Sequence, residues 1–128
     1  MDLDLSGKVV MVTGASRGLG YAIARKFAQE GANLIINSRI SSNITSAAGK
    51  IKKQYGVKVV PIPGDITSVN TCNILTSAME SEFNRLDILV VNSGGPKSGA
   101  FEELTDKDWQ SAFDLCFLGQ ARIIKLPI

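Results

Sequence analysis

Two patterns of apolar residues alternate along the chain. Short runs rich in β-branched residues, such as residues 8–13 (KVVMVT), predict buried strands. Longer stretches carry apolar residues at helical spacing, as Leu19 and Ile23 do within residues 18–30. Gly31 follows that stretch, at a position where glycine commonly ends a helix. The alternation is typical of an α/β fold with a parallel sheet covered on both faces.

The same alternation continues through the rest of the chain. Gly56 is expected to close the second helix, and Asp65 or Thr67 is available to cap the third. No internal repeat or linker interrupts the pattern, so we expect residues 1–128 to form one domain. The further predicted strands are residues 33–37, 57–62 and 86–92, and the further predicted helices are residues 41–55, 67–84 and 105–125.

Composition narrows the classes of function. Apolar residues make up 45% and charged residues 20% of the 128 positions, as in ordinary globular proteins. A net charge of +2 is too small to indicate binding to nucleic acid or to a membrane surface. The polar amino terminus is unlike a signal peptide, and no apolar run approaches the roughly 20 residues of a membrane span.

The chain contains no histidine, which excludes serine–histidine triads, histidine bases and the usual zinc clusters. We therefore expect no metal site. Its two cysteines, Cys72 and Cys116, lie far apart and suggest no disulfide framework. A reducing cytoplasm is the expected location.

A glycine-rich stretch, residues 12–22 (VTGASRGLGYA), joins the first predicted strand to the first predicted helix. Glycines at Gly14, Gly18 and Gly20 permit a tight turn and a close approach by a ligand. The following helix start presents unpaired N–H groups and a positive dipole end, which suit a diphosphate. The spacing differs from G-x-G-x-x-G, and no lysine follows as in a phosphate loop. A tight connection without a ligand is the alternative interpretation.

The segment TGASRGLG (residues 13–20) resembles the cofactor turn of the short-chain dehydrogenase/reductase family. The resemblance extends over essentially the whole chain and implies a Rossmann-like, doubly wound parallel sheet. That sheet would be truncated to about four strands in the order 3-2-1-4. The other segments that resemble the family, in register, are SGKVVMVTG (6–14), GDIT (64–67), LDILVVNSGG (86–95) and TDKDWQSAFDL (105–115).

The resemblance also implies which residues contact a dinucleotide. Asp65 would accept a hydrogen bond from the adenine amine, although it could instead, or also, cap a helix. Asn92 would tie neighbouring loops together, and the glycines after it would leave room for a flat ring. Ser93 and Gly94 depart from the family's Asn-Asn-Ala-Gly pattern. The expected cofactor-binding residues are Gly14, Ser16, Arg17, Gly18, Leu19, Gly20, Arg39, Asp65, Ile66, Asn92, Ser93, Gly94 and Gly95.

The end of the second strand bears on the choice of dinucleotide. An acidic residue there would hold the adenosine ribose of NAD, but the sequence is Asn37-Ser38-Arg39. Arg39 and Arg17 are both placed to meet a 2′-phosphate, which guanidinium groups bind through paired donors. We therefore expect NADP(H) rather than NAD(H). Two solvated surface arginines are the alternative.

The family's hydride transfer, as the resemblance implies it, needs a serine, an asparagine, and a tyrosine followed by a lysine four positions later. Tyr21 has Arg25 four positions later, but it lies beside the diphosphate turn. Tyr55 has Val59 four positions later, where the family has its lysine. Cys116 stands where the family has its asparagine, and we expect it to be inert and half-buried. We thus expect no catalytic residue in the chain, whose match to the family ends with the fifth predicted helix.

Two classes of function stay open. The first is the nucleotide-binding part of an NADP(H)-dependent oxidoreductase acting on a carbonyl or alcohol, completed by a further segment or partner. The second is a non-catalytic nucleotide-binding or interaction protein, a truncated relic. A third alternative is that the dinucleotide site stays empty, because the family's remaining half also contributes to binding. Both classes predict the dinucleotide site, and only the first predicts turnover.

A homo-oligomer is also expected. The fourth strand would be a sheet edge, and its ILVV core has no guarding lysine or proline. The fifth helix carries more apolar residues than one buried face can hold. Those residues are Trp109, Ala112, Phe113, Cys116, Phe117 and Ile123.

Overall fold

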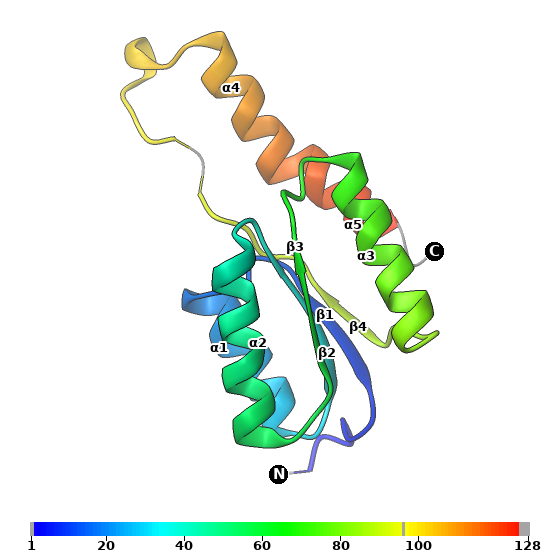
Figure 1. Cartoon of the computed structure of the whole chain (residues 1–128). Coiled ribbons are helices and arrows are strands. Elements are labelled where there is room, and N and C mark those ends of the chain that lie inside the picture. Colours follow the sequence, from blue (N-terminus) through cyan, green and yellow to red (C-terminus); the bar gives the residue numbers. More distant parts are fainter. Residues whose placement is uncertain (1, 96, 126–128) are drawn as a thin grey trace.

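A computed structural model describes residues 2–95 and 97–125. Within these residues, four parallel strands form one sheet in the order β3-β2-β1-β4 (Figure 1). The predicted α/β doubly wound sheet and its strand order are confirmed. The strands are β1 (Val9–Val12), β2 (Asn33–Ser38), β3 (Val59–Pro63) and β4 (Ile88–Val90).

Helices cover both faces of the sheet. The helices α1 (Gly18–Gln29) and α2 (Ser41–Tyr55) pack on one face, and α3 (Val69–Glu82) and α5 (Gly119–Lys125) pack on the other (Figure 1). Because side chains alternate along a strand, each strand contributes to both layers.

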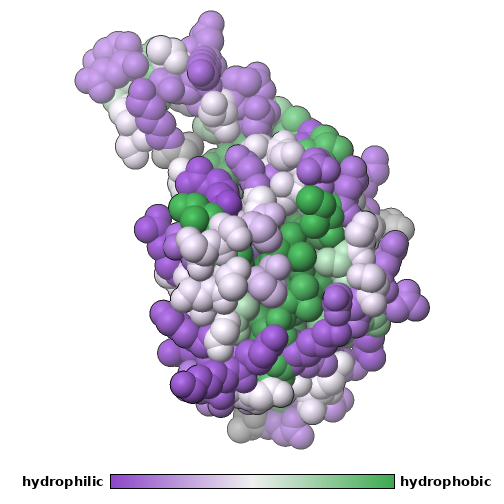
Figure 2. Space-filling model, viewed as in Figure 1, coloured by the Kyte–Doolittle hydropathy of each residue, from purple (hydrophilic) through white to green (hydrophobic). Residues whose placement is uncertain are grey.

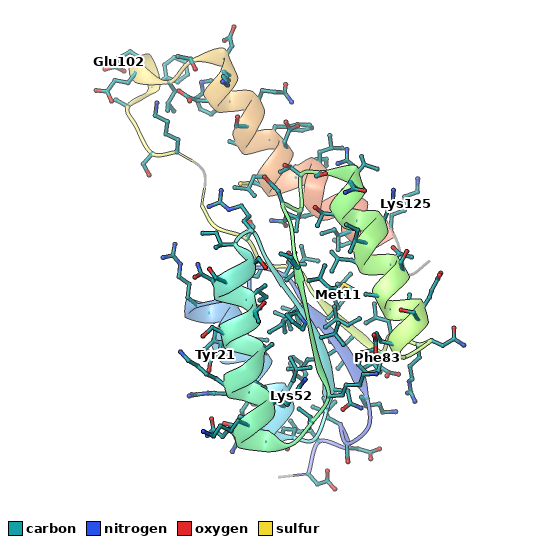
Figure 3. All side chains as sticks on the ribbon, in the orientation of Figure 1. Met11, Tyr21, Lys52, Phe83, Glu102 and Lys125 are labelled. Atoms are coloured by element: carbon teal, nitrogen blue, oxygen red, sulfur yellow. The ribbon has the colours of Figure 1, made fainter. Side chains whose placement is uncertain are left out.

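The central strand β1 illustrates this alternation. Val10 and Val12 lie in the cluster under α1 and α2, whereas Met11 lies in the cluster under α3 and α5. Met11 and Phe83 are labelled in Figure 3, and both belong to this second cluster. The continuous apolar run of β1 in the sequence is therefore the mark of a strand that is buried on both faces.

The strand β3 forms one edge of the sheet and carries two prolines. Lys58 accepts a hydrogen bond from Leu34, and Gly64 donates one to Ser38, so the even-numbered residues between them face β2. Pro61 therefore faces outward, as does Pro63, and neither removes a ladder hydrogen bond. Figure 2 shows apolar surface running down this edge, between the two helical layers.

The strand β4 forms the other edge and is shorter than the predicted residues 86–92. Beyond each end of β4, a side chain accepts one of the hydrogen bonds between β1 and the β4 segment. The Val9 N–H donates to Asp87 Oδ2 (2.8 Å), and the Asn92 N–H donates to Thr13 Oγ1 (2.8 Å). The chain runs alongside β1 over the predicted length, but only Ile88–Val90 form regular strand.

The helix ends agree in part with the predictions. Gly31 and Gly56 follow α1 and α2 with positive φ of 88° and 70°, as the two predicted stops require. The prediction that Asp65 or Thr67 caps the third helix is wrong. Its N-cap is Ser68, whose side chain makes no capping hydrogen bond.

The last predicted helix, residues 105–125, is divided by a π-helical turn. It consists of α4 (Asp106–Phe113), the π-turn η2 (Asp114–Leu118) and α5, after a short 3-10 turn η1 (Phe101–Glu103). In Figure 1, η1 and α4 project away from the sheet.

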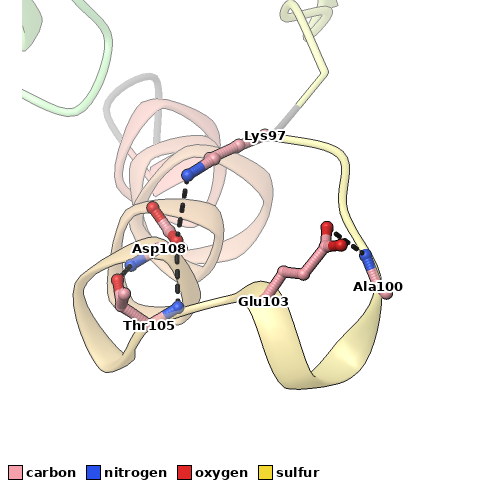
Figure 4. Close-up of polar contacts among 5 residues, drawn as sticks. All are labelled: Lys97, Ala100, Glu103, Thr105 and Asp108. Atoms are coloured by element: carbon pink, nitrogen blue, oxygen red, sulfur yellow. Dashed lines mark hydrogen bonds and ion pairs between the residues drawn. The ribbon is translucent and has the colours of Figure 1, made fainter.

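The start of α4 is fixed by a capping box, shown in Figure 4. The Asp108 N–H donates to Thr105 Oγ1 (3.2 Å), and the Thr105 N–H donates to Asp108 Oδ2 (2.9 Å). Lys97 Nζ also donates to Asp108 Oδ2, at 3.4 Å. The reciprocal pair satisfies two amide groups that would otherwise have no partner at the first turn.

We predict that part of the chain's acid sensitivity comes from Asp87. Hydrogen bonds from the Arg85 guanidinium and the Val9 N–H hold the pKa of Asp87 below its ordinary value. Its stabilising contribution is therefore complete above the unfolded-state pKa of about 3.9 and is lost as the pH falls through the lower folded-state pKa.

Urea unfolding between about pH 6 and about pH 3 tests this prediction. The unfolding midpoint of Asp87→Asn should fall less steeply with decreasing pH than that of the unsubstituted chain. Glu80→Gln, which removes an exposed carboxylate on α3, is the matched control and should leave the slope unchanged. Equal slopes for Asp87→Asn and the unsubstituted chain would contradict the prediction.

Candidate dinucleotide site

A cavity of about 580 Å³ opens at the carboxyl ends of the strands. It lies where the strand order reverses between β1 and β4, the usual ligand position in such sheets. The cavity brings together all of the predicted cofactor residues except Gly20. Those that line it are Gly14, Ser16, Arg17, Gly18, Leu19, Arg39, Asp65, Ile66, Asn92, Ser93, Gly94 and Gly95.

The three glycines of the turn have different physical roles. Gly14 has a φ of 60°, and a Cβ there would lie 2.7 Å from the carbonyl oxygen of Asn92. A Cβ on the buried Gly20 would overlap the carbonyl oxygen of Gly14. Gly18 also has a positive φ, but a Cβ there would meet open space. Gly14 and Gly20 therefore shape the turn, and Gly14 and Gly18 line the cavity.

Hydrogen bonds join the glycine turn to the end of β4. Thr13 Oγ1 donates to the Asn92 carbonyl (2.7 Å) and accepts from the Asn92 N–H (2.8 Å). Asn92 Nδ2 donates to the carbonyl of Gly14 (3.1 Å). The prediction that Asn92 ties neighbouring loops together is confirmed.

The start of α1 is suited to bind an anion. Its N-cap is Arg17, which makes no side-chain capping hydrogen bond, and its first turn carries no acidic residue. The first amides of a helix have no partner within the helix, and they carry the positive end of its dipole. Arg17 and Gly18 both line the cavity, so these amides border it.

Three side chains add polar and positive character to the same region. Arg17 and Arg39 line the cavity, and no ion pair among the described residues involves either of them. Ser38 also lines it, and its Oγ is buried without a hydrogen-bond partner in the described part of the chain. A buried hydroxyl is normally hydrogen-bonded, so Ser38 is suited to receive a polar ligand group.

Asp65 lines the cavity from the loop that follows β3. Its Oδ1 accepts from the N–H of Thr67 (2.9 Å) and from the Thr67 hydroxyl (2.8 Å). The carboxylate thus stabilises a local turn rather than the start of α3. It is exposed at the cavity wall, where an amine could reach it.

Asn37 is a residue that the sequence analysis did not select. It is 1% exposed, and its Nδ2 donates to the carbonyls of Ile62 (2.9 Å) and Gly64 (3.1 Å). It therefore joins the end of β2 to the loop that carries Asp65. A polar residue directly after the apolar run of residues 34–36 was the available signal.

The helical arm, which consists of α4, η2 and α5, supplies a wall of the cavity that was also not predicted. Asp114 accepts a hydrogen bond at Oδ1 from Gln110 Nε2 (3.0 Å), and it lies in the π-turn. Local sequence patterns give no signal for the cavity residues of this arm. Their position depends on how a segment far along the chain packs against the sheet. The unpredicted lining residues are Asn37, Ser38, Ile40, Gly64, Thr67, Ser111, Asp114 and Leu115.

Other candidate groups lie outside the cavity wall. Neither Tyr21 nor Tyr55 lines it, and both pack against the core under α1 and α2. The prediction that Cys116 is half-buried is wrong, because the π-turn leaves it exposed. Burial raises the pKa of the Cys72 thiol.

Over residues 2–95 and 97–125, no cluster of three acidic, cysteine or histidine side chains could hold a metal ion. No helix in this part of the chain has the length and apolar character needed to cross a membrane.

Solved structures show the same arrangement. L-Sorbose reductase from Gluconobacter frateurii, solved with NADPH and L-sorbose, superposes with a TM-score of 0.94 at 33% identity. The match covers 98% of this chain and 48% of the reductase chain. An alcohol dehydrogenase from Thermococcus sibiricus, solved with 5-hydroxy-NADP, has a TM-score of 0.90 at 28% identity over 95% of this chain and 52% of its own.

Comparison of sequences agrees with the structures. Hydroxynaphthalene reductase from Aspergillus fumigatus is 38% identical over 88% of this chain and 41% of its own length. An uncharacterized oxidoreductase from Methylorubrum extorquens is 36% identical over 90% of this chain and 46% of its own length. The chain thus spans somewhat less than half the length of these relatives. The short chain dehydrogenase family model matches residues 8–126, and the chain therefore belongs to the short chain dehydrogenase family.

Proposed function

We propose that residues 1–128 form a dinucleotide-binding domain, the nucleotide-binding part of an NADP(H)-dependent oxidoreductase. The observation that carries this proposal is the shape of one cavity. At the carboxyl ends of parallel strands, it combines the start of α1, which has no side-chain cap, with a glycine beside open space and two arginines. The glycine is Gly18, and the arginines are Arg17 and Arg39. A diphosphate fits the helix start, because unpaired amides and the helix dipole both favour an anion.

The preference for NADP(H) over NAD(H) is supported by the end of β2. Arg39 and Arg17 offer two guanidinium groups that have no ion-pair partner among the described residues. Ser38 adds a buried hydroxyl that has no hydrogen-bond partner among the same residues. A 2′-phosphate would accept hydrogen bonds from all three side chains. The similar L-sorbose reductase was solved with NADPH, in agreement with this preference.

The described residues would divide the remaining work of binding. A bound nicotinamide dinucleotide supplies or accepts a hydride at a carbonyl or alcohol carbon. Asp65 lines one wall of the cavity and would accept from the adenine amine. Gly94 and Gly95 would allow a flat ring to approach the end of β4, because a Cβ at either position would meet open space.

A second candidate function is dinucleotide binding without hydride transfer. The positions of the two tyrosines favour it for the 128-residue chain acting without a partner. Neither tyrosine of the sequence lines the cavity, and Cys116 replaces the asparagine that the family resemblance implies. The acidic side chains that line the cavity are Asp65 and Asp114. We therefore propose that the 128-residue chain binds the dinucleotide and needs further residues for hydride transfer.

Titration with NADPH, followed by nicotinamide fluorescence, tests the proposal. We expect saturable binding and no oxidation of NADPH with a panel of ketones and keto sugars that includes L-sorbose. Turnover by the purified chain would contradict the division between binding and chemistry. Absence of NADPH binding would contradict the proposed function itself.

We also propose that the chain is a cytoplasmic homo-oligomer, joined through the α4 arm, the β4 edge or both. The two cysteines are free, which agrees with a reducing compartment. Trp109, Phe113 and Phe117 are 50%, 49% and 61% exposed on the arm. The rings of Phe113 and Phe117 stack with centroids 5.4 Å apart and present a continuous apolar surface.

Sedimentation tests the oligomer. We expect the unsubstituted chain to sediment as a dimer or larger, and Phe113→Ser combined with Phe117→Ser to shift it toward the monomer by at least about tenfold in dissociation constant. Leu3→Ser removes an exposed leucine that precedes β1 and lies outside both α4 and β4, and should have no effect. A monomeric unsubstituted chain at high concentration would contradict the proposal.

A further inference from the structure

The helix α5 does not line the cavity, yet its polar side chains reach two of the loops that do. Arg122 NH1 donates to the carbonyl of Thr67 (3.0 Å), in the loop after β3. Gln120 Nε2 donates to Ser93 Oγ (3.3 Å), in the loop after β4. Thr67 and Ser93 both line the cavity, so each hydrogen bond ends at its wall.

The backbone of α5 is also pressed against the first of these loops. Gly119 is buried, and a Cβ there would lie 3.1 Å from the carbonyl oxygen of Ile66. Ile123 is 1% exposed and belongs to the same core cluster as Ile66 and Leu75. This close packing leaves α5 little freedom to slide along the loop. The backbone position from which the Arg122 side chain extends is therefore fixed.

The π-turn explains how one helical arm makes these contacts. The Gly119 N–H bonds to the carbonyl of Asp114, which is the wide i→i+5 pattern of a π-turn. This turn places Asp114 at the cavity and Gly119 against Ile66. Irregular turns of this type often occur at functional sites.

Besides the buried side chain of Ile66 and two hydrogen bonds between Gly64 and β2, the loop that Arg122 holds has few other long-range restraints. Asn37 binds the carbonyl of Gly64 at the beginning of the loop (3.1 Å). The hydrogen bonds of Asp65 are local, to Thr67, and the Ser68 N–H bonds to the carbonyl of Asp65 (2.9 Å). The Arg122 hydrogen bond therefore fixes the far end of a loop whose carboxylate faces the cavity.

We propose that Arg122 is a positioning residue that holds the loop of residues 64–68 in the conformation that binds the adenine end of the dinucleotide. This inference rests on the proposed function. Arg122 does not line the cavity and contributes through Thr67. Its effect should be the same for NADPH and NADH, because the 2′-phosphate would lie with Arg17 and Arg39.

Binding measurements provide the first test. Arg122→Met keeps the bulk of the stem but removes the hydrogen bond, and should weaken binding of NADPH and of NADH by about tenfold each. Arg122→Lys retains a donor and should recover part of the affinity. Arg25→Met removes an exposed arginine of α1 that does not line the cavity, and should have no effect.

Amide hydrogen exchange provides a second test that needs no ligand. Exchange at the Ser68 amide should accelerate in Arg122→Met, return toward the original rate in Arg122→Lys, and stay unchanged within β1 and β2. Unchanged Ser68 exchange, or acceleration throughout the sheet, would overturn the positioning role.

The two tests separate the failure of this inference from failure of the proposed function. If the unsubstituted chain binds NADPH and Arg122→Met binds it equally well, the inference is wrong and the function stands. If the unsubstituted chain binds no dinucleotide while Ser68 exchange still accelerates selectively in Arg122→Met, the proposed function is wrong and the loop contact alone is real. In that case the role in dinucleotide binding is rejected as well.

Discussion

Gly20→Ala is expected to abolish measurable NADPH binding and to destabilise the chain. A Cβ at this position would overlap the carbonyl oxygen of Gly14 and lie 2.8 Å from Asn92 Nδ2. The first obstacle is backbone, which cannot rotate away as a flexible side chain could. The turn between β1 and α1 must therefore open, which moves the first amides of α1 away from the position where they would meet a diphosphate.

We expect Gly20→Ala to lose at least about 100-fold in NADPH affinity and about 1–3 kcal/mol in the free energy of unfolding. Fluorescence titration and urea unfolding measure the two effects. Gly49→Ala is the matched control, because Gly49 lies on the exposed side of α2 and a Cβ there meets no atom within 4 Å. It should stabilise the chain by about 0.4–1 kcal/mol. Normal NADPH binding by Gly20→Ala would show that the turn does not form the diphosphate site.

Arg39→Asp is expected to reverse the preference between the two dinucleotides. The substitution removes a guanidinium at the end of β2 and places a carboxylate beside the buried hydroxyl of Ser38. A carboxylate repels a 2′-phosphate, but accepts hydrogen bonds from the two hydroxyls of an unphosphorylated ribose. NADPH affinity should fall by about 10- to 100-fold, and NADH affinity should rise.

Competition between NADPH and NADH, followed by fluorescence, measures this reversal. Arg25→Asp makes the same change of charge on α1, away from the cavity, and distinguishes a local contact from the overall field of the protein. It should leave the ratio of the two affinities within about twofold of the original. If Arg39→Asp also leaves the ratio unchanged, Arg39 is a solvated surface residue.

The elements of the fold could be predicted because their signals are local. The apolar run of β1, the helical spacing of α1 and the stops at Gly31 and Gly56 each depend on neighbours in sequence. The glycine turn could be predicted for the same reason, since Gly14 needs a positive φ and Gly20 needs the absence of a side chain. Such requirements are visible as glycines in the sequence alone.

Contacts between distant segments could not be predicted in this way. The position of Asp114 at the cavity depends on how the arm returns to the sheet, and the exposure of Cys116 depends on the π-turn. The role of Asp65 was open because a carboxylate before a helix can cap the helix or accept from a ligand amine. Thr67 donates to Asp65 from its hydroxyl at 2.8 Å, so Asp65 stabilises a local turn and does not cap α3.

The prolines of β3 have a consequence for how this sheet can be enlarged. A newly arriving strand needs backbone donors, and Pro61 and Pro63 offer none on the outer side of β3. The β4 margin carries no proline. Growth of a fibre by pairing β3 of one molecule with β4 of the next requires both sheet edges to pair with a strand. The β3 edge therefore opposes such growth, while the β4 edge can still pair with one additional strand.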